Sequence, residues 1–295
     1  MKDVLYASPF VPREWIAAHG LRPRCAVAEP LGNGVPLRAS PMGACPFADF
    51  FLQMSASVEA SVFVTSCDQM RRAADQAASR NGGEVFLMNV PATWQVPAAR
   101  QLYRKEIERL GAFLVSIGGV PPSAEALAAE LRSRTWEASP ANRSTAEACK
   151  RVPLALIGES LMPSHFSLPG LLESLGGRVA LDATSLGERG QPVFSDEARI
   201  AEDPFGTLVD GYFDSVADVF QRPNTRLYDW LRPRIAGRGI RGIVLWHYSW
   251  CDLWRAEANR LREEFLLPVL FLDADGSLTP SMKTRLEVFL EILRP

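Results

Sequence analysis

The chain has 295 residues, of which 47% are hydrophobic, and this is enough for the cores of two modest domains. Its 32 basic and 34 acidic residues give a formal charge of −2, which gives no indication of a nucleic acid or another polyanion as partner. No apolar run approaches the ~18 residues that a membrane span needs. The first residues resemble a strand rather than a signal peptide, so we expect a cytoplasmic protein without a membrane partner.

The first part of the chain alternates short apolar runs with helical patterns. The runs are apolar at successive positions, as strands buried on both faces of a parallel sheet require. A helix ended by Gly20 is expected between the first two strands. The strands are predicted at residues 4–7, 25–28, 61–65 and 85–90.

The pattern changes after residue 93. Helical spacing of apolar residues predicts helices at 100–110 and 124–134, and proline-containing segments separate them. We interpret residues 94–150 as a helical connector.

A second alternation of strands and helices fills residues 151–295. Strands are predicted at 152–158, 178–182, 242–246 and 268–273, and helices at 253–265 and 283–293. Residues 187–206 lack periodicity and are expected to form a long surface loop. The predicted fold class is therefore α/β: two doubly wound (Rossmann/flavodoxin-like) parallel-sheet domains, residues 1–93 and 151–295, joined by the helical connector.

Five cysteines are an odd number for a disulfide framework, and a reducing compartment leaves them buried, reactive or metal-bound. Cys67 and Cys251 each follow a predicted strand and precede a helix, where ligands bind in doubly wound folds and where a thiolate is stabilised. Cys45 lies in a loop rich in glycine and proline. Ordinary buried cysteines are the alternative, because the spacing fits no compact zinc or ferredoxin motif. Cys25 and Cys149, inside predicted elements, are interpreted as structural.

Three segments in this order resemble known cluster-binding motifs: residues 43–47 (GACPF), 67–72 (CDQMRR) and 250–254 (WCDLW). They are similar to those of the 2-hydroxyacyl-CoA dehydratase/benzoyl-CoA reductase subunit family, which includes the D-component of 2-hydroxyglutaryl-CoA dehydratase. Residues 89–106 and 284–291 resemble the family's middle segment and C-terminal helix, so the resemblance covers nearly the whole chain.

The resemblance implies a [4Fe–4S] cluster held by Cys45, Cys67 and Cys251, with one iron open to the thioester carbonyl of an acyl-CoA. It also implies a homologous partner subunit in a homo- or heterodimer. A separate ATP-dependent iron–sulfur activator protein supplies one electron in this family. That electron forms a ketyl radical in the dehydratases, which are lyases, or begins ring reduction in the reductases. The chain itself has no phosphate-binding loop, so the energy would come from the activator.

Other polar residues near the cysteines have two interpretations each. Arg71 and Arg72 either screen cluster charge or lie on a solvated helix face, and Asp68 and Asp252 are expected to cap their helices. His247 is either a proton donor to the substrate or a histidine satisfied by backbone.

Glu159 and Ser160, at the matching strand end of the second domain, either contact ligand or begin a helix. The tryptophans around Cys251, Trp246, Trp250 and Trp254, are expected to pack a core.

The segment His247-Tyr248-Ser249-Trp250 replaces a Lys-Phe pair that the family usually has before its third cysteine, and the chain is short for the family. These departures leave substrate identity and CoA binding open. They favour, as an alternative to a catalytic subunit, a non-catalytic electron-transfer or partner subunit. A double-cubane reductase and a metal-free α/β binding protein are further alternatives.

Overall fold

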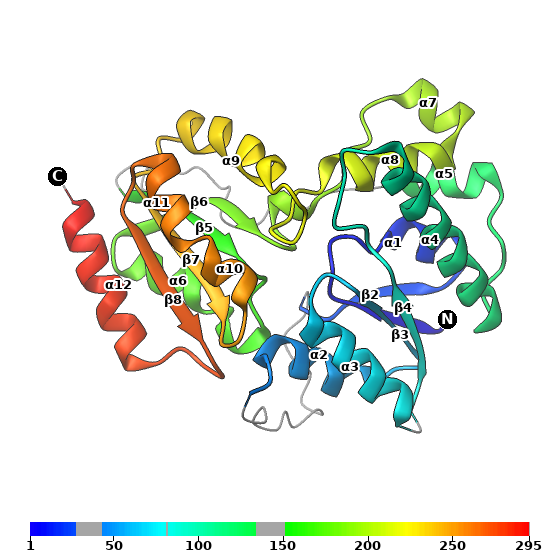
Figure 1. The fold of residues 1–295 in the computed structure, drawn as a ribbon, viewed down its shortest axis with the longest axis horizontal. Helices are drawn as coiled ribbons and strands as arrows, with labels where there is room; N and C mark the ends of the chain where they lie inside the picture. The colour runs from blue at the N-terminus through cyan, green and yellow to red at the C-terminus, as the bar shows by residue number, and fades with distance from the viewer. Residues whose placement is uncertain (28–42, 81, 134–150, 295) are drawn as a thin grey trace. The chain divides into compact units, whose positions relative to one another are not determined.

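A computed structural model describes residues 1–27, 43–80, 82–133 and 151–294 of the chain (Figure 1). The chain divides into two compact units, each built from three segments. The first unit comprises residues 1–38, 48–136 and 190–223, and the second comprises residues 39–47, 137–189 and 224–295. Each unit contains a four-stranded parallel sheet with helices on both faces. The predicted α/β class with two doubly wound sheets is confirmed.

The sheet of the first unit has the strand order β2-β1-β3-β4, and each pair of neighbours is parallel. The inner strands, β1 and β3, are buried at every position, which explains their nearly continuous apolar sequences. The edge strand β2 is partly exposed and contains Pro23, which an edge position tolerates. The bounds are β1 Asp3–Tyr6, β2 Arg22–Cys25, β3 Ala60–Val64 and β4 Glu84–Met88.

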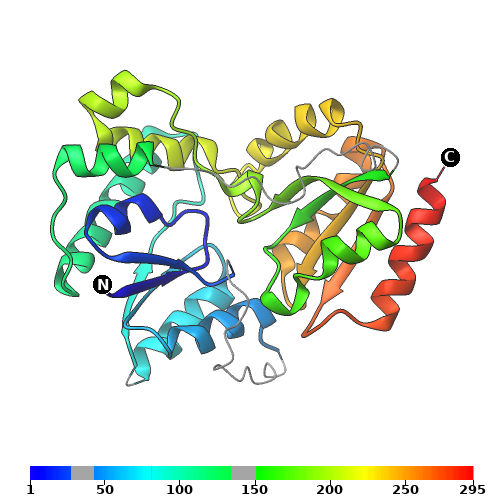
Figure 2. The ribbon, with the colours of Figure 1, turned by 180° about the vertical axis from the view of Figure 1, so that it is seen from behind.

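Helices cover both faces of this sheet (Figures 1 and 2). On one face lie α2 (Pro46–Ser55) and α3 (Asp68–Ser79), and on the other lie α1 (Arg13–Ala18) and α4 (Pro97–Ser116). The buried residues of α3 recur at helical spacing, so one stripe of this helix packs against the sheet: Met70, Ala73, Ala74 and Ala77.

The predicted connector is part of the first unit rather than a separate element. α4 carries a buried stripe, and the Tyr103 hydroxyl donates to the Phe10 carbonyl at 2.7 Å. The Trp15 indole donates to the Ile107 carbonyl at 3.0 Å, so α4 is fixed on α1. The helix α5 (Ala124–Arg132) also packs on α1. Local periodicity predicted these helices but could not reveal the surface that buries their apolar side.

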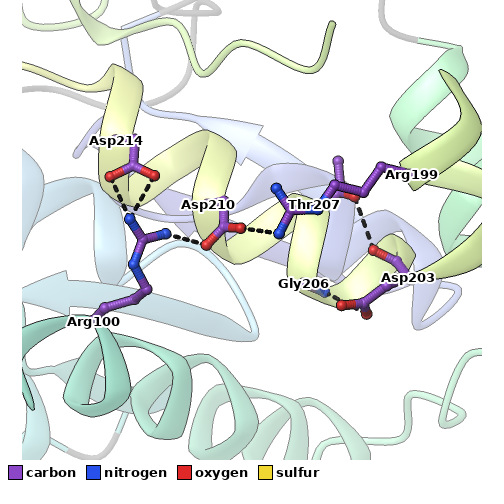
Figure 3. A network of polar contacts seen from close by, with 7 residues as sticks. All are labelled: Arg100, Arg199, Asp203, Gly206, Thr207, Asp210 and Asp214. Atoms are coloured by element: carbon purple, nitrogen blue, oxygen red, sulfur yellow. Dashed lines mark hydrogen bonds and ion pairs between the residues drawn. The ribbon is translucent and has the colours of Figure 1, made fainter. Parts of the chain in front are cut away.

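Residues 190–223 return to the first unit and form α7 (Glu197–Glu202) and α8 (Pro204–Ser215). A network of charges joins these helices to α4 (Figure 3). Arg100 of α4 pairs with Asp210 and, at 2.7 Å, with Asp214, both on α8. Arg199 of α7 pairs with the second oxygen of Asp210. Shared carboxylates of this kind fix geometry better than isolated surface pairs do.

The sheet of the second unit has the same topology, with the order β6-β5-β7-β8 and parallel neighbours throughout. The strands are β5 Val152–Gly158, β6 Gly177–Thr184, β7 Gly242–Tyr248 and β8 Val269–Ala274. α6 (Leu168–Ser174) and α12 (Pro280–Leu293) cover one face (Figure 2). The other face carries α9 (Thr225–Gly237), α10 (Asp252–Ala256) and α11 (Ala258–Phe265). None of the described helices has the length and apolar character needed to cross a membrane.

Two predictions for the second half of the chain are wrong. The segment 187–206 is not one long surface loop: it contains the short helical turn Glu188–Gly190 and α7, and its longest stretch without regular structure is residues 191–196. Arg189 is fully buried and donates to the carbonyls of Gly158 (3.1 Å) and Ala183 (3.0 Å). The helix predicted at 253–265 is two helices, α10 and α11, which meet at the buried Glu257. Sequence periodicity does not report contacts with distant residues: Arg189 bonds distant carbonyls, and Glu257 accepts from the side chains of Asn224 at 2.7 Å and Tyr228 at 2.5 Å.

Candidate functional site

Cys67 lies at the carboxyl end of the inner strand β3, in the first unit. Thr65 fixes the turn, because its N–H donates to the Met88 carbonyl at 3.0 Å and its hydroxyl accepts from the Val90 N–H at 3.0 Å. Cys67 is the N-cap residue of α3, and its Sγ accepts a hydrogen bond from the Met70 N–H at 3.4 Å. The helix therefore stabilises negative charge on this sulfur.

The cap of α3 is the cysteine, not Asp68 as the sequence had suggested. Asp68 is the first helical residue, with its side chain 92% exposed and an ion pair to Arg71 at 3.9 Å. Arg71 also donates to the Thr65 carbonyl at 3.5 Å, one turn from Cys67. Arg72 is exposed. The Asp68 charge contributes to the first turn through the helix dipole rather than through a cap.

Cys251 occupies the corresponding place in the second unit, after the inner strand β7. The turn before it is fixed to β8: the Ser249 N–H donates to the Ala274 carbonyl at 2.9 Å, and the Ser249 hydroxyl donates to Asp273 at 3.0 Å. The Cys251 N–H donates to the Tyr248 carbonyl at 3.0 Å. Cys251 is the N-cap residue of α10 without a side-chain cap bond, and Asp252 is again the first helical residue.

Cys45 belongs to the second unit and is buried. Its neighbour Phe47 stacks on the Tyr248 ring, with 5.6 Å between centroids and 25° between planes. Burial is the main reason that the pKa of Tyr248 is raised, and the nearby Cys45 thiol contributes in the same direction. The segments of Cys45 and Cys251 thus meet around Tyr248, while Cys67 belongs to the other unit.

His247 is buried on β7, directly before Tyr248. Its Nδ1 lies 3.0 Å from the Tyr248 carbonyl and 3.9 Å from Asp273, and its ring packs 4.1 Å from the Phe271 ring. Its Nε2 is buried and has no hydrogen-bond partner in the described part of the chain. Burial lowers the pKa of this imidazole, so it is neutral at pH 7. The predicted interaction of His247 with backbone is therefore present at Nδ1, and Nε2 can still form one hydrogen bond.

Glu159 and Ser160 follow β5, at the same edge of the second sheet. The Ser160 hydroxyl lies 2.9 Å from the Ser185 hydroxyl and accepts from the Leu186 N–H at 2.8 Å. Glu159 accepts from the Ser160 N–H at 2.9 Å and from the Ser185 hydroxyl. Neither residue begins a helix, which was one of the two interpretations of the sequence. Together they connect the ends of β5 and β6.

Comparison with known proteins identifies the family. The sequence matches the family described as "2-hydroxyglutaryl-CoA dehydratase, D-component" over residues 9–139 and 134–293. The chain belongs to this family. No curated protein matches the sequence. Among solved structures, the metal-dependent lipoprotein YcdH from Bacillus subtilis covers 99% of this chain and 97% of its own, with a TM-score of 0.26 and 11% identity. So low a score carries no inference.

The cysteines of this D-component family member are of the chemical type that an iron–sulfur cluster would need. The four described cysteines, Cys25, Cys45, Cys67 and Cys251, all carry thiols, which are the ligands of such clusters. Among the described residues, no group of three or more His, Cys, Asp and Glu side chains is placed to hold a metal ion.

The remaining cysteines and tryptophans differ in their surroundings. Cys25 ends the edge strand β2 and is half-buried, and Cys149 lies outside the described residues. Trp246 and Trp254 are in the core, with 0% and 1% exposure, as expected. Trp250 is 58% exposed, so the expectation of core packing is wrong for this residue.

Two polar residues lie beside the candidate site residues of this D-component family member and have no motif in the sequence. His165 is fully buried between the rings of Trp246 and Tyr248, at 4.9 and 5.7 Å, and burial lowers its pKa to about 4. Tyr248 donates to the Ser160 carbonyl at 3.0 Å and accepts from the Met162 N–H at 2.7 Å. The only signal in the sequence was rarity, because His165 is one of three histidines.

Proposed function

We propose that this chain is the cluster-holding subunit of a 2-hydroxyacyl-CoA dehydratase-type or benzoyl-CoA reductase-type enzyme. Membership of the D-component family supports a role as a component of a dehydratase. The observation that carries the finer proposal is the repeated placement of Cys67 and Cys251. Each is an N-cap residue directly after an inner parallel strand, the position where doubly wound folds bind ligands.

In this proposal Cys45, Cys67 and Cys251 ligate one [4Fe–4S] cluster. When bound, the cluster would supply one-electron transfer and an open coordination position for the thioester carbonyl of an acyl-CoA. The chain's own contribution is to hold its thiols as thiolates. The Met70 N–H favours the thiolate of Cys67, and Arg71 and Arg72 add positive charge on the same helix.

The second unit would contribute the groups that contact substrate. The Nδ1 of the neutral His247 donates to the Tyr248 carbonyl, so its buried Nε2 is an acceptor whose partner would be the proton of a substrate hydroxyl. Glu159 and Ser160 already bond each other and Ser185, so we assign them to holding this edge of the sheet in place for the substrate. His247 is therefore the first choice for substitution.

The partners in this proposal are an acyl-CoA substrate, a homologous subunit in a homo- or heterodimer, and an ATP-dependent iron–sulfur activator in the cytoplasm. A second candidate function is a non-catalytic electron-transfer or partner subunit. It is favoured by the segment before Cys251, where a strained tryptophan and a buried histidine replace the residues usual in the family.

The test is iron and sulfide analysis of the full chain after anaerobic purification or reconstitution. We expect about four iron and four sulfide per chain. The variants C45S, C67S and C251S should each lose most of both, whereas C25S, a matched change at a cysteine outside the set, should keep them. Full iron content in the three variants would refute the ligand assignment.

A second measurement separates the two candidate functions. A catalytic subunit should show a change in its EPR or absorption spectrum when acyl-CoA is added, and H247Q should weaken that change. A cluster that ignores every acyl-CoA but is reduced by the activator indicates the electron-transfer subunit.

A further inference from the structure

The backbone at Trp250 is unusual. In the described part of the chain, only two residues other than glycine have φ in the left-handed region, Trp250 at 69° and Leu266 at 51°. Bulky L-residues rarely adopt this conformation, which suits glycine. Leu266 has a local reason, because it ends α11 and its N–H donates to the Arg262 carbonyl at 3.0 Å. Trp250 ends no helix and lies between β7 and Cys251.

The neighbours of Trp250 impose this conformation. On one side, Ser249 is bonded to Ala274 and Asp273 of β8, and on the other the Cys251 N–H is bonded to the Tyr248 carbonyl. Any residue at position 250 is therefore held in the left-handed region. In the first unit the equivalent residue, Ser66 before Cys67, has no positive φ. The strain is specific to the second turn, and observed strain of this kind is concentrated at functional sites.

The Trp250 side chain is not in the core. It is 58% exposed, while Trp246 and Trp254, four residues before and after it, are 0% and 1% exposed. A large apolar ring is thus presented to solvent one residue before a proposed cluster ligand. Aromatic rings of this kind contribute large contact areas in binding sites.

The charges near this turn select the kind of ligand. Three exposed carboxylates, Asp252, Asp273 and Asp275, lie at the start of α10 and at the end of β8, against one exposed cation on α10, Arg255. This excess of negative charge disfavours the anionic phosphates of CoA at Trp250. It leaves an uncharged, apolar group as the suitable partner of the indole.

We propose that Trp250 binds the hydrocarbon part of the acyl group and so sets the preference for acyl chain length. This inference rests on the proposed function, because it takes an acyl-CoA as the substrate. The left-handed turn presents the indole beside Cys251, where the thioester end of the same molecule would react. The residue is a specificity determinant rather than a catalytic group.

The test is the affinity of the anaerobically purified full chain for CoA and for butanoyl-, hexanoyl- and octanoyl-CoA, measured by calorimetry. The wild type should bind about twofold more tightly per added methylene, as expected for a chain that one ring half covers. W250G should remove this gain while leaving the affinity for CoA itself unchanged, and W250F should keep most of it. The conservative variant thus separates loss of the ring from loss of the fold.

Thermal unfolding provides an independent readout. W250G should raise the midpoint by about 2 °C, because glycine relieves the strained backbone. L266G is the matched control: it relieves the same kind of strain at an exposed residue and should raise the midpoint with no effect on acyl-CoA binding. A functional role for Trp250 is supported if W250G raises the unfolding midpoint but weakens acyl-chain binding, while L266G raises the midpoint only.

Each other outcome overturns the inference. If W250G keeps the wild-type preference for chain length, or loses stability, Trp250 does not hold the acyl group. A wild type that binds every acyl-CoA equally, or a W250G that alters only association with another protein, also refutes it while the proposed function stands. A wild type that binds no acyl-CoA refutes this inference and the thioester substrate together.

Discussion

The two units repeat one topology. In β2-β1-β3-β4 and in β6-β5-β7-β8, the first strand in sequence lies second in the sheet and the third strand lies beside it. Cys67 follows the third strand of one sheet, and Cys251 follows the third strand of the other. The same topological position therefore carries a cysteine twice, although the surrounding sequences differ. Topology determines where a ligand residue is useful, and local sequence determines how it is held.

The two cysteines are held differently. α3 has 12 residues with a buried stripe, and Cys67 caps it through its sulfur. α10 has five residues, and Cys251 has no side-chain cap bond there. Its turn is fixed instead by hydrogen bonds to β8 and by the strained Trp250. We infer that the helix defines the first thiol position and that the sheet edge defines the second.

The largest expected effect tests the close packing of the second sheet. Gly158 ends β5 with φ 140°, and a Cβ there would lie 1.7 Å from the Trp246 carbonyl oxygen. The equivalent strand of the first unit ends at Tyr6 without such a constraint. G158A should lower the free energy of unfolding by about 4 kcal/mol in urea denaturation.

The control is G170A, in α6 of the same unit, where an added Cβ meets no atom within 4 Å. This change should be neutral or should stabilise by up to about 1 kcal/mol, because alanine favours helix. If G158A loses less than about 1 kcal/mol, the end of β5 tolerates a side chain as well as the end of β1 does.

Acid should weaken the second unit more than the first. The pKa of His165 is about 4 in the folded chain against 6.5 ordinarily, because burial disfavours the charged form. The fold therefore favours neutral His165, and this stabilisation is complete above pH 6.5 and is lost as the pH falls toward 4. The loss should reach about 2 kcal/mol at pH 5.

H165F removes this titration and leaves His19 and His247 in place, so the difference between wild type and variant isolates the effect. Urea denaturation at pH 7.5 and pH 5 gives both values, and hydrogen exchange assigns the loss to a unit. If the unfolding free energies of wild type and H165F fall equally between pH 7.5 and pH 5, the effect does not come from His165.

The smallest effect compares the two caps directly in the metal-free chain. C67A should cost about 1 kcal/mol of unfolding free energy, because the Met70 N–H loses its acceptor. C67S should cost less, since serine is a preferred N-cap residue. C251A should cost less than C67A, because Cys251 makes no side-chain cap bond to α10. Equal costs at both cysteines would remove the distinction between helix-held and sheet-held thiols.

Much of the fold was predictable because apolar runs report buried strands. The prediction of 152–158 coincides with β5, and those for β3 and β7 differ only at their ends. The prediction of 25–28 missed β2, because Arg22, Pro23 and Arg24 form a polar edge strand without an apolar run. Unit boundaries were not predictable, since they depend on which surface buries each helix.

The candidate site was predictable where the order of strand, cysteine and helix along the chain determines it. Both strand-end cysteines were found, but their caps were assigned to the aspartates that follow, because cysteine is not among the usual N-cap residues. His165 and Arg189 could not be found, since both owe their roles to burial against residues far away in sequence. The strain at Trp250 could not be found either, since it depends partly on the hydrogen bond of its neighbour Ser249 to Ala274 of β8.

The interleaved course of the chain has a consequence for synthesis on the ribosome. Because α7 and α8 lie in residues 190–223, the first unit remains incomplete until about three quarters of the polypeptide has been made. A gene fragment that stops after α5 would encode a sheet whose helix α4 lacks its partners Asp210 and Asp214. Neither half of the chain contains all the segments of one unit, so we expect neither half to fold independently.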